Sequence, residues 1–175
     1  MNNFVTLDLE TIPSGKYPTT EYMIENHPKT MKVEKTIKAW AEKEENKEEA
    51  FRKRAVNPMQ AQVIVISAAF KEEKPIIIAY DDEEKVFKEF DRWLSSIETN
   101  TPVYAWDVVG QNIEFDLDML FIRASKYDCF KIKDLVPDSP YSDRIQDTMK
   151  LPFPASRQKH YVSLDVLLKY FNIGE

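Results

Sequence analysis

Two apolar runs separated by four charged residues constrain the fold of this chain more than any other feature of its sequence. Residues 62–70 read QVIVISAAF, and residues 75–80 read PIIIAY. Runs of this length that are rich in β-branched residues predict buried strands, and the short connection between them predicts an antiparallel hairpin. We therefore expect a β-sheet at the centre of the fold.

Strand-like and helix-like patterns alternate along the rest of the chain. Apolar residues recur at helical spacing over 83–98, and Asp81 or Asp82 can cap that helix. We also predict strands over 3–9, 102–106 and 144–149, one long or two shorter helices over 30–56, helices over 115–127 and 164–171, and loops over 14–28, 107–113 and 128–142. This order predicts an α/β fold of one domain over residues 1–175, a ribonuclease-H-like mixed sheet flanked by helices, with a helical insertion after the first strand.

The rarest residue types exclude several kinds of functional site. Three of the 175 residues are glycine, and the chain has neither a GxGxxG loop nor a P-loop, which excludes the common phosphate-binding loops. A single cysteine, Cys129, excludes an internal disulfide and a multi-cysteine zinc site. His27 and His160 are too far apart to form an HExxH motif. Any metal used for hydrolysis must therefore be held by carboxylates, which favours Mg²⁺ or Mn²⁺.

The charge of the chain is unevenly distributed. The net charge is −6, so we do not expect the whole surface to bind nucleic acid by charge alone. Residues 29–56, however, contain nine Lys or Arg and six Glu. They either contact an incoming nucleic-acid strand or form a solvated helix with Glu–Lys pairs along its surface. No apolar run approaches the roughly 18 residues of a membrane helix, and no signal peptide is present, so we expect a cytoplasmic protein with no membrane partner.

Two groups of acidic residues stand where chemistry could occur. Asp8 and Glu10 are two residues apart at the exit of the first predicted strand, so both side chains point to one face of the sheet. Like charges in this arrangement repel each other unless a cation lies between them or one is protonated. Asp116 lies in the first turn of a predicted helix that follows another strand. Each group could also have no catalytic role. Asp8 and Glu10 would then lie on a solvated edge of the sheet, and Asp116 would belong to an acidic first turn of a helix.

These residues resemble the motifs of the DEDD, or DnaQ-like, superfamily of 3′–5′ exonucleases. Asp8, Glu10 and Thr11 match the first motif of that family, and Asn112, Phe115 and Asp116 match the second. The sequence is most similar to the predicted exonucleases related to the proofreading domain of family B DNA polymerases, because it also contains three shorter matches over most of its length. These are Asn57-Pro58, Arg123-Ala124 and Ser163-Leu164-Asp165, whereas Gln111 stands where the family often has histidine.

The resemblance implies metal-dependent hydrolysis of a single-stranded nucleic acid from its 3′ end, with release of nucleoside monophosphates and with DNA favoured over RNA. Two Mg²⁺ or Mn²⁺ ions would flank the scissile phosphate. By the family's pattern, Asp8 would bridge both ions, Glu10 would bind the ion that activates water, and Asp116 would help to hold the other. Thr11, Asn112 and Phe115 would seat the terminal nucleotide.

The family's third motif is an aspartate on a late helix, four residues after a tyrosine or histidine. Tyr161 and Asp165 match this spacing, but the Ser-Leu-Asp context of Asp165 is that of a helix which precedes the third motif in the family. We therefore expect the third motif beyond Glu175 rather than at Asp165. Two alternatives stay open: a truncated or non-catalytic module that binds nucleic acid or a protein partner on the same fold, and an exonuclease directed at RNA.

Overall fold

The computed structural model describes residues 3–98, 100–150 and 163–171. It divides into two compact units. We call residues 1–10 and 64–175 the sheet unit, and residues 11–63 the inserted unit. The inserted unit begins in the last residues of the first strand and includes the predicted helical insertion, but it is longer than residues 29–56.

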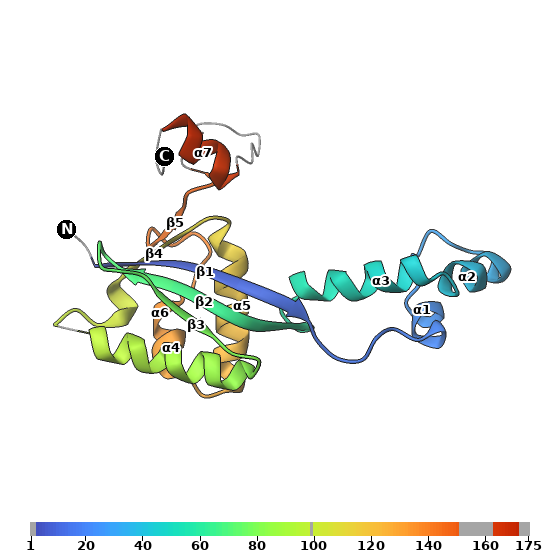
Figure 1. The fold of residues 1–175 in the computed structure, drawn as a ribbon, viewed down its shortest axis with the longest axis horizontal. Helices are drawn as coiled ribbons and strands as arrows, with labels where there is room; N and C mark the ends of the chain where they lie inside the picture. The colour runs from blue at the N-terminus through green and yellow to red at the C-terminus, as the bar shows by residue number, and fades with distance from the viewer. Residues whose placement is uncertain (1–2, 99, 151–162, 172–175) are drawn as a thin grey trace. The chain divides into compact units, whose positions relative to one another are not determined.

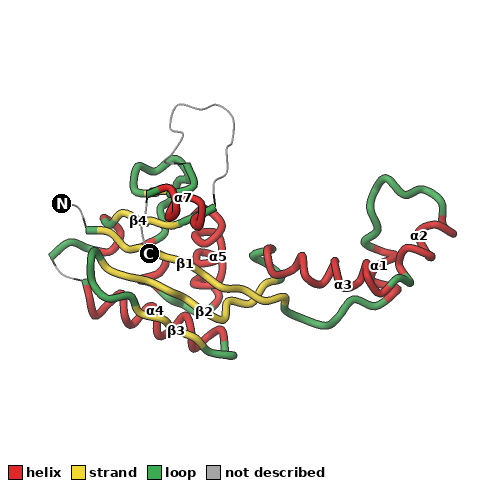
Figure 2. Tube along the Cα trace, turned by 45° about the horizontal axis from the view of Figure 1, so that its top comes forward, coloured by secondary structure: helices red, strands yellow, loops and turns green. Residues whose placement is uncertain are grey.

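The sheet has five strands in the order β3-β2-β1-β4-β5, and Figure 2 shows β3, β2, β1 and β4 side by side. Strand β2 pairs antiparallel with β3, while β1 pairs parallel with β4 and β4 parallel with β5. Their bounds are Phe4–Pro13 (β1), Ala61–Phe70 (β2), Ile76–Ala79 (β3), Asp107–Gly110 (β4) and Ile145–Asp147 (β5). This is the predicted ribonuclease-H-like mixed sheet, and the predicted hairpin is confirmed.

Three helices of the sheet unit form a layer beside the sheet (Figure 1). Helix α6 (Phe130–Leu135) contacts both α4 (Glu83–Ile97) and α5 (Ile113–Lys126). Their apolar stripes are buried, and Asp82 caps α4 by accepting a hydrogen bond from the Glu84 amide at 3.0 Å, as predicted. The largest fully buried side chains of this unit include Trp106, Phe87, Phe90, Ile66, Leu94, Met119 and Leu120. Helix α7 spans Leu164–Tyr170, close to the predicted bounds.

The strand predicted over 102–106 is wrong. Val103–Ala105 form a short 3₁₀ helix, in which the Ala105 amide donates to the Pro102 carbonyl at 2.9 Å. The strand β4 begins one residue after the predicted strand ends, where a loop was expected. Val103 and Trp106 are buried, so their apolar character marks the core correctly. Burial alone, however, does not distinguish a strand from a compact turn.

Two short helices were not predicted. Helix α1 (Thr20–Glu25) and helix α6 have six residues each, and both lie in segments that we expected to be loops. A helix of six residues has too few turns to show an apolar periodicity, and tertiary contacts supply most of its stability. In α6 these contacts involve Ile132 and Leu135, which are fully buried.

The inserted unit contains helices α1, α2 (Glu34–Ala41) and α3 (Glu44–Arg52), followed by a 3₁₀ turn over Lys53–Val56. The two-helix alternative for residues 30–56 is therefore correct. Arg54 points into this unit, where its guanidinium donates to the Lys16 carbonyl at 2.7 Å and lies 5.1 Å from the Tyr22 ring centroid. Among the described residues of the whole chain, no helix is long and apolar enough to cross a membrane.

Candidate functional site

Asp8 and Glu10 lie on one side of β1, as the alternation of the sequence predicts. Their side chains are exposed, whereas those of Leu7 and Leu9, which alternate with them along the strand, are buried. The parallel pairs between β1 and β4 end at Thr6, which pairs with Val109. The two carboxylates therefore stand beyond the registered pairs, on the part of β1 that continues past the end of β4.

Gly110 brings β1, β4 and the start of α5 close together at this point. A Cβ atom at Gly110 would lie 2.7 Å from the Leu7 carbonyl oxygen and 2.6 Å from Cδ1 of Ile113. Both distances are far below van der Waals contact, so a side chain cannot be added here without moving backbone. This close approach of Gly110 to Leu7 and Ile113 allows α5 to begin three residues after β4 ends. Asn112, between the two elements, has a left-handed conformation with φ 55°.

Asp116 projects from the first turn of α5 and is only 4% exposed. Burial, followed by the neighbouring negative charges of Asp8, Glu10 and Asp147, raises the pKa of Asp116 to about 8. The structure thus brings the three predicted metal ligands, Asp8, Glu10 and Asp116, into one electrostatic cluster. We call these three residues and Asp147 the carboxylate cluster.

Asp147 is the fourth member, and the sequence analysis missed it. It is the last residue of β5, is 6% exposed and pairs with Gly110 in the sheet. Its Oδ1 accepts hydrogen bonds from the backbone amides of Asn112 and Met149, both at 3.0 Å. Its Oδ2 lies 3.5 Å from the Lys150 ammonium. The available signal was an aspartate within the strand predicted over 144–149, although the structure ends that strand at Asp147.

The other predicted residues are more dispersed. Thr11 belongs to the inserted unit, where its hydroxyl donates to the Ala55 carbonyl at 2.7 Å. Asn112 has an exposed side chain and Phe115 a half-buried one, and both belong to the turn that opens α5. Asp165 is exposed on α7, and Tyr161 lies outside the described residues, as does His160.

The donor set suits a hard divalent cation, because carboxylate oxygens are the ligands that Mg²⁺ and Mn²⁺ prefer. The three carboxylates that raise the pKa of the buried Asp116 carry negative charge that a cation would compensate. Within residues 3–98, 100–150 and 163–171, however, no three His, Cys, Asp or Glu side chains converge closely enough to hold an ion in the arrangement described. Binding would therefore require rotation of exposed side chains, and those of Asp8 and Glu10 are free of the constraints of burial.

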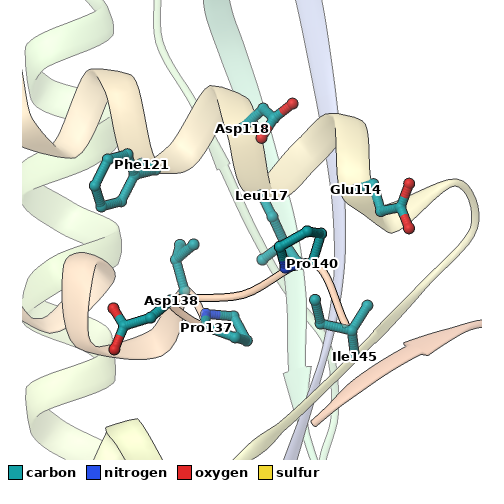
Figure 3. A pocket seen from close by; sticks show the side chains of 9 residues that line it. Glu114, Leu117, Asp118, Phe121, Pro137, Asp138, Pro140 and Ile145 are labelled. Atoms are coloured by element: carbon teal, nitrogen blue, oxygen red, sulfur yellow. The ribbon is translucent and has the colours of Figure 1, made fainter. Parts of the chain in front are cut away.

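A separate pocket lies on another face of α5 (Figure 3). It has a volume of about 350 Å³, and its apolar wall includes Leu117, Phe121 and Pro140. Glu114, Asp118 and Asp138 add three carboxylates to its lining. No residue of the carboxylate cluster lines it, so we do not assign it to the candidate site. A second, adjoining pocket of about 280 Å³ includes Asp147 and Lys150 in its lining.

The comparisons of the sequence with protein-family models and with curated proteins found no match.

Proposed function

We propose that this protein is a metal-dependent 3′–5′ exonuclease that removes nucleoside monophosphates from the end of single-stranded DNA. The observation that carries the proposal is the environment of Asp116, a buried carboxylate surrounded electrostatically by Asp8, Glu10 and Asp147. Strongly perturbed carboxylates of this kind concentrate at functional sites. The motif resemblance, on the same three residues that were expected to bind metal, supports this reading.

In the proposed reaction Asp8, Glu10 and Asp116 would hold two Mg²⁺ or Mn²⁺ ions. When bound, such ions activate water and stabilise the charge that develops on the phosphate and the leaving 3′ oxygen. Asp147 keeps the first turn of α5 in place through the Asn112 amide, and thereby positions Asp116. Asn112 and Phe115, which belong to the turn that opens α5, would contact the terminal nucleotide in this proposal.

Divalent-ion binding can be tested apart from catalysis. Mn²⁺ should raise the melting temperature of the full chain in a concentration-dependent way, because a ligand that binds the folded state stabilises it. The variant Asp116→Asn should lose most of this effect. Asp118→Asn is the matched control, since Asp118 is exposed on the same helix two residues away. A melting temperature unchanged by Mn²⁺ in the wild-type protein would contradict the proposed metal site.

Catalysis is tested with 5′-labelled DNA and RNA strands of one sequence, incubated with Mg²⁺ or Mn²⁺. We expect a ladder of products shortened from the 3′ end, faster on DNA, which is lost in Asp8→Ala and kept in Asp118→Asn. A faster ladder on RNA would redirect the proposal to an RNA exonuclease. Intact strands in every reaction would contradict hydrolysis.

The second candidate function is binding of nucleic acid without hydrolysis. It is favoured by the absence, among the described residues, of three converged metal ligands. Retention of a labelled strand without shortening, in the presence of either ion, would support this candidate over the exonuclease.

A further inference from the structure

The structure separates the nine basic residues of 29–56 into two groups. Residues 44–56 contain four basic and four acidic side chains, and most of the basic ones have partners. Lys47, Arg52 and Lys53 form ion pairs with glutamates three or four residues earlier on α3. Arg54 is turned inward onto backbone carbonyls and aromatic rings. This half of the unit therefore presents little unbalanced positive charge.

Residues 29–43, which we call the lysine segment, carry the whole positive excess of residues 29–56. They contain five lysines and two glutamates. All five lysines are exposed, and within the described part of the chain none of them lies within ion-pair distance of a carboxylate. Lys35 and Lys38 lie one turn apart on α2, so they share a face of that helix. The lysines of the segment are Lys29, Lys32, Lys35, Lys38 and Lys43.

From this placement we infer that the lysine segment binds the sugar-phosphate backbone of the nucleic-acid strand without reading its sequence. Exposed ammonium groups that are not compensated by neighbouring carboxylates bind polyanions by releasing their counterions. The remainder of the chain is strongly acidic, so its general surface repels such a strand. The inference rests on the proposed function for the identity of the polyanion.

A nucleic acid fits the lysine segment better than an anionic membrane does. Peripheral membrane helices combine a basic face with a broad exposed apolar face. In residues 29–43 the exposed large hydrophobic side chain is Val33, at 62%, while Ile37 and Trp40 are half-buried. One exposed valine gives too little apolar surface for insertion among lipids, whereas backbone phosphates need only the charges.

The test compares two triple variants that change the net charge equally within the inserted unit. Lys32, Lys35 and Lys38 are each changed to Gln in the first, and Lys47, Arg52 and Lys53 in the second. Binding of the full chain to a labelled single strand is measured by fluorescence anisotropy in EDTA, which suppresses metal-dependent cleavage, over a range of salt concentrations. Thermal melting confirms that both variants fold.

The first variant should bind about tenfold or more weakly at 0.1 M salt, and its plot of log affinity against log salt should be shallower by up to about 2. The second variant should keep the wild-type slope. Equal loss of affinity in both variants, or no loss in the first, would overturn the inference. The inference would also be overturned if the lysines were needed for binding to vesicles of anionic lipid but not for binding to the strand.

These outcomes are separable from those of the proposed function. Lysine-dependent binding with no cleavage under Mg²⁺ or Mn²⁺ would contradict the exonuclease and support the lysine segment. Cleavage that is accompanied by unchanged binding in the first variant would support the exonuclease and contradict the lysine segment.

Discussion

At the scale of single residues, Asp116 has the environment that departs most from that of an ordinary surface carboxylate. Its folded-state pKa of about 8 lies above the value of 3.8 that it has in an unfolded chain. Between about pH 4 and pH 8, the folded protein therefore holds a proton at Asp116 that the unfolded chain has already released. Without a bound cation, ionisation of this group makes the fold less stable as the pH rises through that window.

The variant Asp116→Asn should remove this pH dependence, because a carboxamide does not ionise. In EDTA, the variant should gain stability relative to the wild type between pH 5 and pH 8, by an amount on the order of 2 kcal/mol. Denaturant unfolding at several pH values measures the difference. Asp118→Asn should show no such trend, since Asp118 is exposed. A stability difference that does not vary with pH would contradict the burial and repulsion described for Asp116.

At the scale of secondary structure, the end of β5 and the start of α5 depend on each other. Asn112 precedes α5 in a left-handed conformation, and its side chain makes no capping hydrogen bond to the helix. Its backbone amide is instead held by Asp147, whose Oδ1 also accepts from Met149. The positive end of the α5 dipole favours a carboxylate in this place. Asp147 thus fixes the orientation in which α5 presents Asp116.

Replacing Asp147 tests this positioning role. Asp147→Ala should destabilise the fold by about 1–3 kcal/mol, because two part-buried backbone amides lose their acceptor. It should also weaken Mn²⁺ binding by displacing Asp116. Asp147→Asn keeps an acceptor oxygen, so it should retain more of both stability and Mn²⁺ affinity. Thermal melting with and without Mn²⁺ checks this order, and Gln146→Ala provides a neighbouring control. Equal losses of Mn²⁺ affinity in the Ala and Asn variants would refute the role of the hydrogen bonds.

At the scale of the whole molecule, the two units differ in the size of their cores. In the inserted unit, whose residues are all described, the buried apolar side chains apart from Pro18 are Met23, Ala41, Ala61 and Val63. The sheet unit buries several large aromatic and aliphatic side chains, including Trp106 and Phe87. Since local stability follows buried apolar surface, the inserted unit should open more easily than the sheet unit.

Hydrogen exchange can measure this difference. The amides of α1, α2 and α3 should exchange faster than those of Val5–Leu9 in β1 and of α4, by about a factor of ten or more, because each 1.4 kcal/mol of opening free energy changes the exchange rate tenfold. Peptide-resolved mass spectrometry compares the segments in one sample. Equal protection in the two units would show that they unfold as one cooperative body.

Much of the fold could be predicted because its signals are local. The hairpin of β2 and β3, the helix α4 with its Asp82 cap, and the alternation of β1 each depend on neighbouring residues. The predicted strand over 102–106 was several residues too early for β4. The start of β4 depends on pairing with distant strands and on the compact turn after Pro102. The helix α6 was missed because it gains its stability from packing against α4 and α5.

The sequence by itself determined the class of the fold, the exclusion of glycine, cysteine and histidine sites, and the candidate ligands Asp8, Glu10 and Asp116. It could do so because residue type and spacing along a strand or helix fix which side chains share a face. Only the tertiary structure showed that Asp147 joins them and that Gly110 permits the close approach of β1 and α5. It also showed that Lys47, Arg52 and Lys53 form ion pairs while the lysines of the lysine segment are exposed. Burial and charge repulsion arise between residues that are distant in the chain, and a charged side chain often has several possible ion-pair partners. Tertiary packing therefore determines which of these interactions form.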